Sequence, residues 1–546
     1  MRRRLVLPAL ATVLLLAGCV SIPTSGDVQT EAIDSDPSEV DTVTLPDGPV
    51  AGQSMDEILL GFLRAGRAPQ GPYTVAKEFL APNTDWSGTS RVLVTTNQSA
   101  PVQLDDDTLG VTVTVVGEVD ESGHYTEIPA QNQTLTYDFT VVDGENRIAR
   151  ADPGTVLSQQ SFGRVFDSYP LYYFDPSFEY LVPDLRWFPA TRNVVSRIVT
   201  ELIEGPAPWL GSGVLVSAFP LDASLTRAVY EAPAVDIVLS PEVRSESAVS
   251  QRRMLQQLDA SLSALGNVND ITVTAGELDL APSPETEIES TYSVGDGAVG
   301  GWSGRFGVLT AEGISPLPSI DTRADDLQPT AASLGRDRGS VAVLGPAGVT
   351  LVDASGDPVP IDARGGLIAP SLDPYGFVWS VPRSSPGALL VVDSAGEQYA
   401  LALPVDGEVI SLEVSRDGAR VLLALATPSG PRVTVVGIQR DADLLPVAFG
   451  APYDLDVDGQ VVDVAWVDGT HVAVLWTDVE GTQAEVRALG GPAQPLGEID
   501  GAVSIVGGNL VAGIRVLLAD GTVHRPSEAG GWRDTGLVAS FLGTQQ

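Results

Sequence analysis

The spacing of apolar residues changes along the chain and divides it into stretches with different predicted structures. In the first stretch, residues 5–17 form a continuous apolar run that follows three arginines. The run has 13 residues, whereas a helix that crosses a membrane needs about 20. A basic segment, a short apolar run and small residues at its end are typical of a secretory signal peptide that is cleaved. We therefore predict that residues 1–18 are a signal peptide.

From Ser54 onward, apolar residues first have the spacing of a helix and then alternate with polar residues as in strands. Ser54 and Glu57 have the spacing of a capping box before the apolar residues 58–63, which predicts the start of a helix. A second short helix is predicted at residues 72–80, because a proline suits the first turn and another proline follows the segment. Helices followed by strands indicate a small α+β domain at residues 54–160, with strands predicted at 91–96, 111–116 and 134–142.

The next stretch, residues 161–285, again combines strands and helices. Prolines and acids interrupt an aromatic segment at 169–189, so we predict two strands there rather than a helix. Apolar residues then recur with a period near 3.6 over residues 194–203, and Gly205-Pro206 ends this predicted helix. These features predict a second α+β domain, with a further helix at 247–265 and strands at 214–219, 228–230, 235–239 and 271–274.

From residue 290 to residue 546 short apolar strands alternate with Asp/Gly turns. Four-stranded propeller blades repeat every ~40–45 residues, and the turns here repeat every 42 residues or so. We therefore predict an all-β propeller with about six blades; five or seven blades, or a pair of β-sandwiches, stay open as alternatives. The turns that set this spacing centre near Gly339, Gly376, Gly418, Gly469 and Gly508. The predicted fold class is thus two small α+β domains followed by a propeller.

Cys19 is the only cysteine of the chain and directly follows the predicted signal peptide. The preceding residues Leu16, Ala17 and Gly18 make this segment resemble the lipobox of bacterial lipoproteins. The resemblance implies cleavage before Cys19 and a diacylglycerol thioether on its sulfur, with a further acyl chain such as palmitate. Two acyl chains hold a protein stably on a membrane, whereas one does so only marginally. The alternative is an ordinary signal peptide followed by an incidental cysteine.

The segment that follows, residues 19–53, is rich in Ser, Thr, Asp, Pro and Gly, which predicts a flexible linker between the lipid and the folded domains. The net charge of the chain is −40, from 71 acids and 31 bases. Nucleic-acid binding depends on basic residues that neutralise phosphates, so we expect no nucleic-acid partner. The same charge argues against a body that lies flat on anionic lipid.

Few motifs for catalysis or metal binding occur in the sequence. Asp454, Asp456 and Asp458 resemble the start of a calcium loop, but Ala465 occupies the position of its bidentate acid, so this is a weak metal candidate. Residues 295–300 match a dinucleotide-binding pattern but precede a predicted strand instead of a helix, so we predict no nucleotide site. The three histidines are scattered. We therefore expect no cofactor and no enzymatic activity.

Five tryptophans fall within predicted propeller strands. They either pack between blades, which we favour, or form an aromatic floor for glycan or peptide at the propeller mouth. These residues are Trp302, Trp379, Trp466, Trp476 and Trp532.

Residues 193–206, the turn at 218–220 and the strand at 235–240 resemble the GerMN module. Together with the lipobox and the aromatic block at 169–189, most of the chain resembles actinobacterial LpqB-type lipoproteins. This resemblance implies a lipid-anchored protein on the extracytoplasmic face of the cell membrane. It also implies a partner, the extracytoplasmic domain of a sensor histidine kinase, in a two-component system for envelope homeostasis. The alternative hypothesis is an envelope glycan- or peptide-binding protein, or a hydrolase, that uses the propeller mouth.

Overall fold

The computed structural model describes part of the chain, and all structural statements below concern these residues. They are residues 46–68, 73–211, 213–280, 292–295, 297–318, 320–354 and 356–546. The predicted signal peptide, the lipobox with Cys19 and the linker up to residue 45 lie outside them. Pro46–Gln546 form one compact unit. No helix in the described ranges is long and apolar enough to cross a membrane.

The first domain begins with the predicted capping box. Helix α2 (Met55–Ala65) starts after Ser54, whose Oγ accepts a hydrogen bond from the Glu57 backbone N–H at 3.4 Å. In return, Glu57 Oε2 accepts one from the Ser54 backbone N–H at 2.9 Å. The predicted helix is confirmed, and its apolar side contributes Ile58 and Leu59 to the core. The short helix α3 (Thr74–Glu78) packs beside it.

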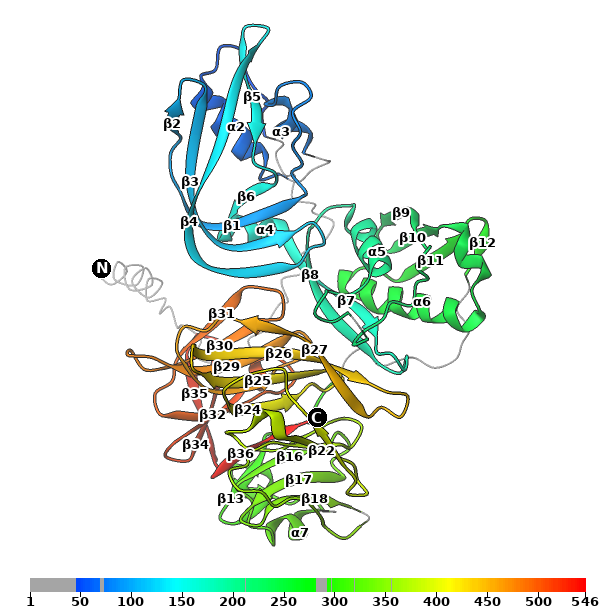
Figure 1. Ribbon diagram of the computed structural model, residues 1–546, viewed down its shortest axis with the longest axis vertical. Coiled ribbons are helices and arrows are strands. Elements are labelled where there is room, and N and C mark those ends of the chain that lie inside the picture. The colour runs from blue at the N-terminus through cyan, green and yellow to red at the C-terminus, as the bar shows by residue number, and fades with distance from the viewer. Residues whose placement is uncertain are drawn as a thin grey trace, which may run out of the picture. The chain divides into compact units, whose positions relative to one another are not determined.

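A curved sheet covers these two helices. Its order is β5-β4-β3-β1-β6, with β2 paired to β3, and the pairing of β1 with β6 is parallel. Figure 1 shows the long strands β3 and β4 bending across the domain. The turn that joins them, residues 121–124, matters for the site described below. The strands are β1 (Arg91–Gln98), β2 (Val102–Asp105), β3 (Thr108–Asp120), β4 (Tyr125–Val142), β5 (Glu145–Ala151) and β6 (Thr155–Ser158).

The second domain starts after α4 (Gln159–Val165) with a long antiparallel hairpin. Its strands β7 (Phe166–Phe174) and β8 (Leu181–Pro189) confirm the prediction of two strands in the aromatic segment. Alternate residues of β7, among them Leu171 and Tyr173, are fully buried in the core of this domain.

The rest of the second domain is a four-stranded sheet with helices α5 (Val194–Glu204) and α6 (Ala248–Leu262), as predicted. Gly205 ends α5 with a φ of 111°, a conformation that favours glycine. The sheet order is β12-β11-β10-β9. The remaining elements are β9 (Leu225–Glu231), β10 (Ala234–Leu239), β11 (Asp270–Ala275), β12 (Leu278–Asp279) and the 3₁₀ turns η1 (Pro241–Ser245) and η2 (Ser263–Leu265).

The strand predicted at 214–219 is wrong. Only Val216 makes a bridge there, with Phe174 of β7. The next backbone donor, Ala218 N–H, is bonded at 2.7 Å to the side-chain oxygen of Gln257 on α6 rather than to a neighbouring strand. The segment is therefore a loop that buries Val214 and Leu215 without joining a ladder. Apolar character indicated burial correctly, but burial does not require a strand.

The third domain, residues 292–546, is built almost entirely of antiparallel sheets of consecutive strands. Four of its sheets have four strands each, in the orders β20-β21-β22-β23, β24-β25-β26-β27, β28-β29-β30-β31 and β32-β33-β34-β35. The fifth has eight strands, in the order β15-β14-β13-β36-β16-β17-β18-β19. In that sheet the last strand of the chain joins the first strands of the domain.

The bounds of this domain's elements are as follows. The first half contains β13 (Val299–Trp302), β14 (Arg305–Thr310), β15 (Gly313–Ser315), α7 (Asp321–Asp325), β16 (Ala331–Leu334), β17 (Ser340–Gly345), β18 (Gly348–Asp353), β19 (Val359–Asp362), β20 (Ser371–Leu372), β21 (Val378–Ser380), η3 (Pro386–Ala388), β22 (Leu389–Val392) and β23 (Gln398–Leu401). The second half contains β24 (Glu408–Val414), β25 (Arg420–Thr427), β26 (Gly430–Arg440), β27 (Pro446–Leu455), β28 (Gln460–Trp466), β29 (His471–Thr477), β30 (Thr482–Ala488), β31 (Ala493–Glu498), β32 (Ala502–Val506), η4 (Val511–Gly513), β33 (Arg515–Leu518), β34 (Thr522–Pro526), β35 (Trp532–Val538) and β36 (Phe541–Gln545).

Polar side chains on β16, β20, β24 and β28 each link that strand to a strand of the next sheet along the chain. A hydroxyl or carboxylate oxygen on one strand accepts a backbone N–H of the following strand, which satisfies both groups in the interior. The acceptors and donors are Ser333 and Leu372 (3.0 Å), Ser371 and Val414 (3.0 Å), Glu413 and Trp466 (3.1 Å), and Asp463 and Ile505 (3.0 Å). Within the eight-stranded sheet, Thr544 of β36 donates to Ser333 of β16 at 2.9 Å.

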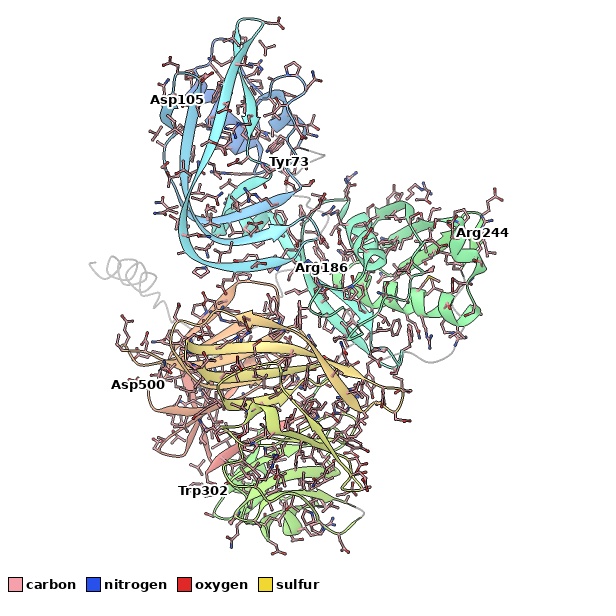
Figure 2. All side chains as sticks on the ribbon, in the orientation of Figure 1. Tyr73, Asp105, Arg186, Arg244, Trp302 and Asp500 are labelled. Carbon is pink, nitrogen blue, oxygen red and sulfur yellow. The ribbon has the colours of Figure 1, made fainter. Side chains whose placement is uncertain are left out.

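The predicted fold class is confirmed: two small α+β domains precede a β-propeller-like domain. The number of blades stays a prediction, because β36 merges strands from both ends of the domain into one continuous sheet. Two of the five tryptophans, Trp379 and Trp466, are 1% exposed and pack in the core, whereas Trp302 is 38% exposed (Figure 2).

Candidate functional site

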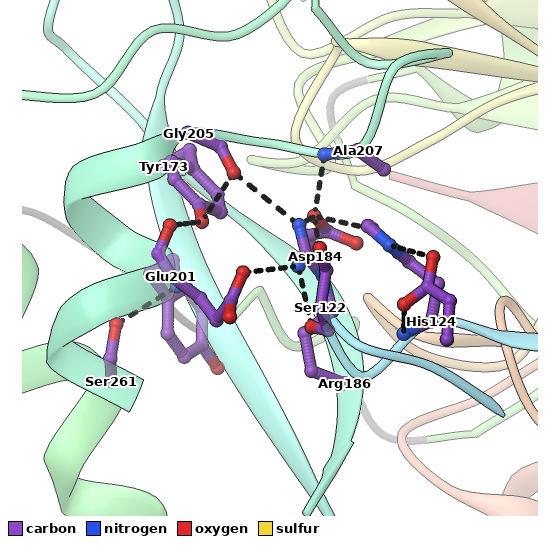
Figure 3. A network of polar contacts seen from close by, with 11 residues as sticks. Ser122, His124, Tyr173, Asp184, Arg186, Glu201, Gly205, Ala207 and Ser261 are labelled. Carbon is purple, nitrogen blue, oxygen red and sulfur yellow. Dashed lines mark hydrogen bonds and ion pairs between the residues drawn. The ribbon is translucent and has the colours of Figure 1, made fainter. Parts of the chain in front are cut away.

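A buried network of charged side chains lies where the hairpin of the second domain contacts the first domain (Figure 3). At its centre are Asp184 and Arg186, which are 5% and 1% exposed. They are two residues apart on β8, and side chains at this spacing share one face of a strand. Arg186 donates from Nη2 and Nε to Asp184 Oδ2 at 2.7 and 3.2 Å. The two charges thus compensate each other away from water.

The remaining groups of Arg186 and Asp184 bind the end of α5 and the first domain. Arg186 Nη1 donates to the Ser122 carbonyl at 2.9 Å and lies 3.5 Å from Glu201 Oε2. Asp184 Oδ2 also accepts the backbone N–H of Ala207 at 2.8 Å. The ion pair therefore connects the turn at 121–124 of the first domain with the segment after α5.

Tyr173 completes the network from β7. Its hydroxyl lies 2.8 Å from the Glu201 carbonyl and 2.9 Å from the Gly205 carbonyl, both at the C-terminal end of α5. The last carbonyls of a helix have no partner within the helix and carry partial negative charge. A buried hydroxyl and the Arg186 guanidinium are therefore suitable partners for this end.

His124 belongs to the first domain and lies between two carboxylates. Its Nδ1 is 3.3 Å from Asp120 Oδ2, and its backbone N–H donates to Asp120 Oδ1 at 2.9 Å. Its Nε2 is 3.9 Å from Asp184 Oδ2 of the second domain. The imidazole thus bridges an acid of its own domain and an acid of the neighbouring one.

The pKa values in the network follow from burial and from these charges. Burial alone would raise the pKa of Asp184, but Arg186 and the hydrogen bonds of His124 and Arg186 lower it to about 2. Burial lowers the pKa of His124, but the carboxylates of Asp120 and Asp184 more than offset this, so the pKa is raised. Burial raises the pKa of Glu201, and Arg186 opposes this only in part.

The same hairpin also contacts the third domain. Trp187 Nε1 donates to the Gly490 carbonyl at 2.7 Å, and Trp187 N–H donates to the Gly123 carbonyl of the first domain at 2.7 Å. Arg487 of the third domain forms ion pairs with Glu127 of the first domain and with Glu485, the latter at 2.7 Å. The β7–β8 hairpin and these ion pairs therefore hold all three domains together.

This arrangement suits the positioning of one domain against another. Most of its polar groups make contacts between elements, and the charges at its centre are buried. Among the residues that the structure describes, no group of three or more His, Cys, Asp or Glu side chains could hold a metal ion. The network can therefore fix one domain against another, and it can respond to the charge of His124.

The residues singled out from the sequence are distributed as follows. Cys19, Leu16, Ala17 and Gly18 lie outside the described residues, so their predicted roles stay predictions. Asp454 lies near the end of β27, where both of its oxygens bind Arg432, at 2.6 and 2.8 Å. Asp456 and Asp458 are exposed in the loop that follows.

Sequence reasoning missed the Asp184–Arg186 network. The available signal was an acid and a base two residues apart within an otherwise apolar strand, residues 181–189. Charged residues are rarely buried unless they are paired, so such a pair in a predicted core strand indicates a buried ion pair. His124 gave no signal, because the sequence does not show that Asp184 lies near it.

Three family models match the chain in order. "Lipoprotein LpqB, N-terminal domain" matches residues 48–163, "Sporulation and spore germination" matches 170–277, and "Lipoprotein LpqB beta-propeller domain" matches 304–539. The two models named for LpqB together match more than half of the chain.

Full-length relatives and solved structures were also found. Proteins named Lipoprotein LpqB from Cutibacterium acnes and Bifidobacterium longum are 24% and 26% identical, over 97% and 98% of both chains. A chain of a nidogen/laminin complex aligns over 45% of this chain and 95% of its own, with 10% identity and a TM-score of 0.32. The tandem GerMN domains of GerM from Bacillus subtilis align over 23% and 48%, with 15% identity and a TM-score of 0.19.

The family models taken together and the relatives each cover most of the chain. The relatives' shared name indicates a membrane-anchored lipoprotein. The chain therefore belongs to the LpqB family of lipoproteins.

Proposed function

We propose that the chain is a lipid-anchored scaffold on the extracytoplasmic face of the cell membrane that regulates a sensor histidine kinase without catalysing a reaction itself. The anchor is Cys19, modified with diacylglycerol after cleavage of residues 1–18. Support for the anchor comes from the sequence around Cys19 and from the family name. The linker lets the acidic folded part stand away from anionic lipid, which would repel it.

The observation that best supports a scaffold is the junction of the three domains on the β7–β8 hairpin. Arg186 Nη1 and the Trp187 backbone N–H link the hairpin to the first domain, and the Trp187 indole links it to the third. Arg487 of the third domain also forms an ion pair with Glu127 of the first. A scaffold needs surfaces that keep a fixed relation to one another. Buried charges are costly to separate because each would be left without compensation in a medium of low dielectric constant.

The proposed partner is the extracytoplasmic domain of a sensor histidine kinase in a two-component system for envelope homeostasis. The support for this choice is the resemblance to LpqB-type lipoproteins described above. Anchoring both proteins in one membrane confines them to a thin layer, so even a weak contact becomes frequent. The contact then needs no large interface to change the signalling state of the kinase.

Replacing the anchor residue tests this proposal. We expect Cys19→Ala to leave the fold unchanged but to abolish retention in the membrane fraction and the dependent kinase signalling. The measurement is the distribution between membrane and soluble fractions after a high-salt wash, with Ser38→Ala in the linker as a control that stays in the membrane. A Cys19→Ala variant that remains bound to the membrane after the wash would contradict the anchor.

Crosslinking in intact membranes, followed by affinity purification of the chain, tests the partner. Recovery of a sensor histidine kinase with the wild-type chain, and its loss with Cys19→Ala, is the expected result. The alternative of a glycan- or peptide-binding protein or a hydrolase predicts binding to purified peptidoglycan fragments or turnover of muropeptides instead. The burial of Trp379 and Trp466 supports the scaffold over an aromatic binding floor.

A further inference from the structure

The contact between the first two domains includes one histidine, His124, whose charge can change near neutral pH. His124 lies in the turn that follows β3, and its ring is placed between Asp120 of the first domain and Asp184 of the second. The neighbouring backbone contacts are close: Trp187 N–H donates to the Gly123 carbonyl at 2.7 Å, and Arg186 Nη1 donates to the Ser122 carbonyl. A change at His124 therefore acts directly on the junction.

The number of protons on the imidazole decides how well it fits this position. A neutral imidazole has one N–H, and a carboxylate can only accept. Asp120, at 3.3 Å from Nδ1, takes that N–H. Nε2 is buried, makes no hydrogen bond with any described residue and faces Asp184 at 3.9 Å. Without a second proton, a lone pair would face a buried carboxylate; with it, the charged ring attracts both acids.

We propose that His124 is a pH-dependent latch, which holds the first domain against the second when its imidazole is protonated and loosens the contact when the proton is lost. Protonation converts the Nε2–Asp184 approach into an ion pair between domains. Loss of the proton leaves Asp184 paired with Arg186 alone and leaves the turn at 121–124 held only by its backbone contacts.

Asp184, Arg186 and Asp120, which surround His124, keep their charges at neutral pH. On β8, the pKa of Asp184 is about 2 and that of Arg186 is raised. On β3, burial raises the pKa of Asp120, but the hydrogen bonds of His124 lower it by more, so the pKa is lowered overall. Other charged or titratable side chains in this region include Glu121 in the turn, Arg197 and Glu201 on α5, and Tyr173 on β7. Burial raises the pKa of Glu201. Histidine alone among these types ordinarily titrates near neutral pH.

The direction of the pH effect follows from the raised pKa of His124. The closed junction binds the proton more tightly than the open or unfolded chain does, so protonation favours closure. The stabilisation is complete below the ordinary histidine value near 6.5 and is lost as the pH rises through the higher value of the closed state. The junction should therefore open more often under mildly alkaline conditions.

Two measurements on the full chain test the latch. The first is an NMR titration of the imidazole carbons, where the chain offers only three histidines and single substitutions assign them. The second is hydrogen exchange of the Trp187 amide, whose N–H crosses the junction, compared with the Leu489 amide, which donates to the Thr470 carbonyl within the third domain. His124→Gln removes the proton, and His471→Gln is the matched control because His471 also pairs with a nearby acid, Asp468, but within one domain.

We expect His124 to titrate above the ordinary histidine value near 6.5. Between pH 6 and pH 9 the opening constant at Trp187 should rise about tenfold for each unit by which the pKa of His124 is raised. The rise should disappear in His124→Gln and persist in His471→Gln, while Leu489 shows no such change. A His124 pKa at or below the ordinary value near 6.5 overturns the latch. So does a raised pKa without a matching change in exchange at Trp187, and this result requires no variant to fold.

Discussion

Glu413 is a carboxyl group in the interior of the third domain, where water cannot stabilise its charge. It is 5% exposed, and its Oε2 accepts the backbone N–H of Trp466 at 3.1 Å. Burial raises the pKa of Glu413 to about 8, with Arg416 and the Trp466 hydrogen bond opposing only part of this effect. The group is therefore mostly protonated at neutral pH and links two sheets without a net charge.

This raised pKa makes the stability of the third domain depend on pH. The folded state keeps a proton that the unfolded chain releases above its ordinary value of 4.5, so the contribution of Glu413 to stability is greatest below pH 4.5 and is lost as the pH rises through about 8. Glu413→Gln keeps an acceptor for Trp466 but cannot ionise. We expect it to be more stable than the wild type at pH 9 by roughly 1–4 kcal/mol, at about 1.4 kcal/mol for each pKa unit.

Urea unfolding at several pH values from 5 to 9 checks this prediction. The control is Glu408→Gln, since Glu408 begins the same strand but is exposed. A wild-type domain whose stability does not fall relative to Glu413→Gln between pH 6 and pH 9 would show that the carboxyl is not neutral at this position.

At the scale of elements, the β7–β8 hairpin is the part of the chain on which the three domains meet. Trp187 contributes on both sides: its backbone N–H binds Gly123 of the first domain, and its indole N–H binds Gly490 of the third. Its ring also lies 5.0 Å from that of Phe162 on α4. One residue thus combines apolar packing with hydrogen bonds to two domains.

Trp187→Phe removes the indole N–H while it keeps an aromatic ring. We expect the contact with the third domain to weaken by about 1 kcal/mol, or somewhat more if the Gly490 carbonyl stays without a donor. Hydrogen exchange of the segment around Gly490 should become faster. Trp302→Phe, on an exposed tryptophan, is the control and should leave this segment unchanged. Equal exchange in both variants would mean that the 2.7 Å bond does not hold the domains together.

Local patterns predicted individual elements well and their contacts poorly. The capping box at Ser54, the apolar stripe of α5 and the two aromatic strands are set by neighbours in the sequence, and all three are confirmed. The sequence predicts a strand at 214–219, where the structure has a loop, because burial in a loop and burial in a sheet select the same apolar residue types. The site is formed by residues between 120 and 207 that come together only in the folded chain. The spacing of apolar residues within one element therefore could not reveal it.

At the scale of the whole molecule, the third domain depends on contacts between its two ends. The repeat of turns predicted its sheets, because each sheet is made of consecutive strands. The repeat did not predict that β36 pairs with both β13 and β16, since these strands are more than 200 residues away in the sequence. Closing a ring of sheets protects strand edges that would otherwise be exposed. The stability of all sheets should therefore depend on this one joint.

Gly300 offers a way to disturb the joint selectively. It lies on β13 opposite Leu542, and a Cβ there would lie 2.4 Å from the Phe541 carbonyl oxygen, too close for the two strands to keep their spacing. We expect Gly300→Ala to cost about 1–3 kcal/mol, as overpacking does elsewhere. Gly365→Ala is the matched control, because its Cβ meets no atom within 4 Å. Hydrogen exchange should increase in distant sheets such as that of β24 to β27, as well as in β13 and β36. If only β13 and β36 exchange faster, the sheets are stable independently and closure by β36 is a local feature of the fold.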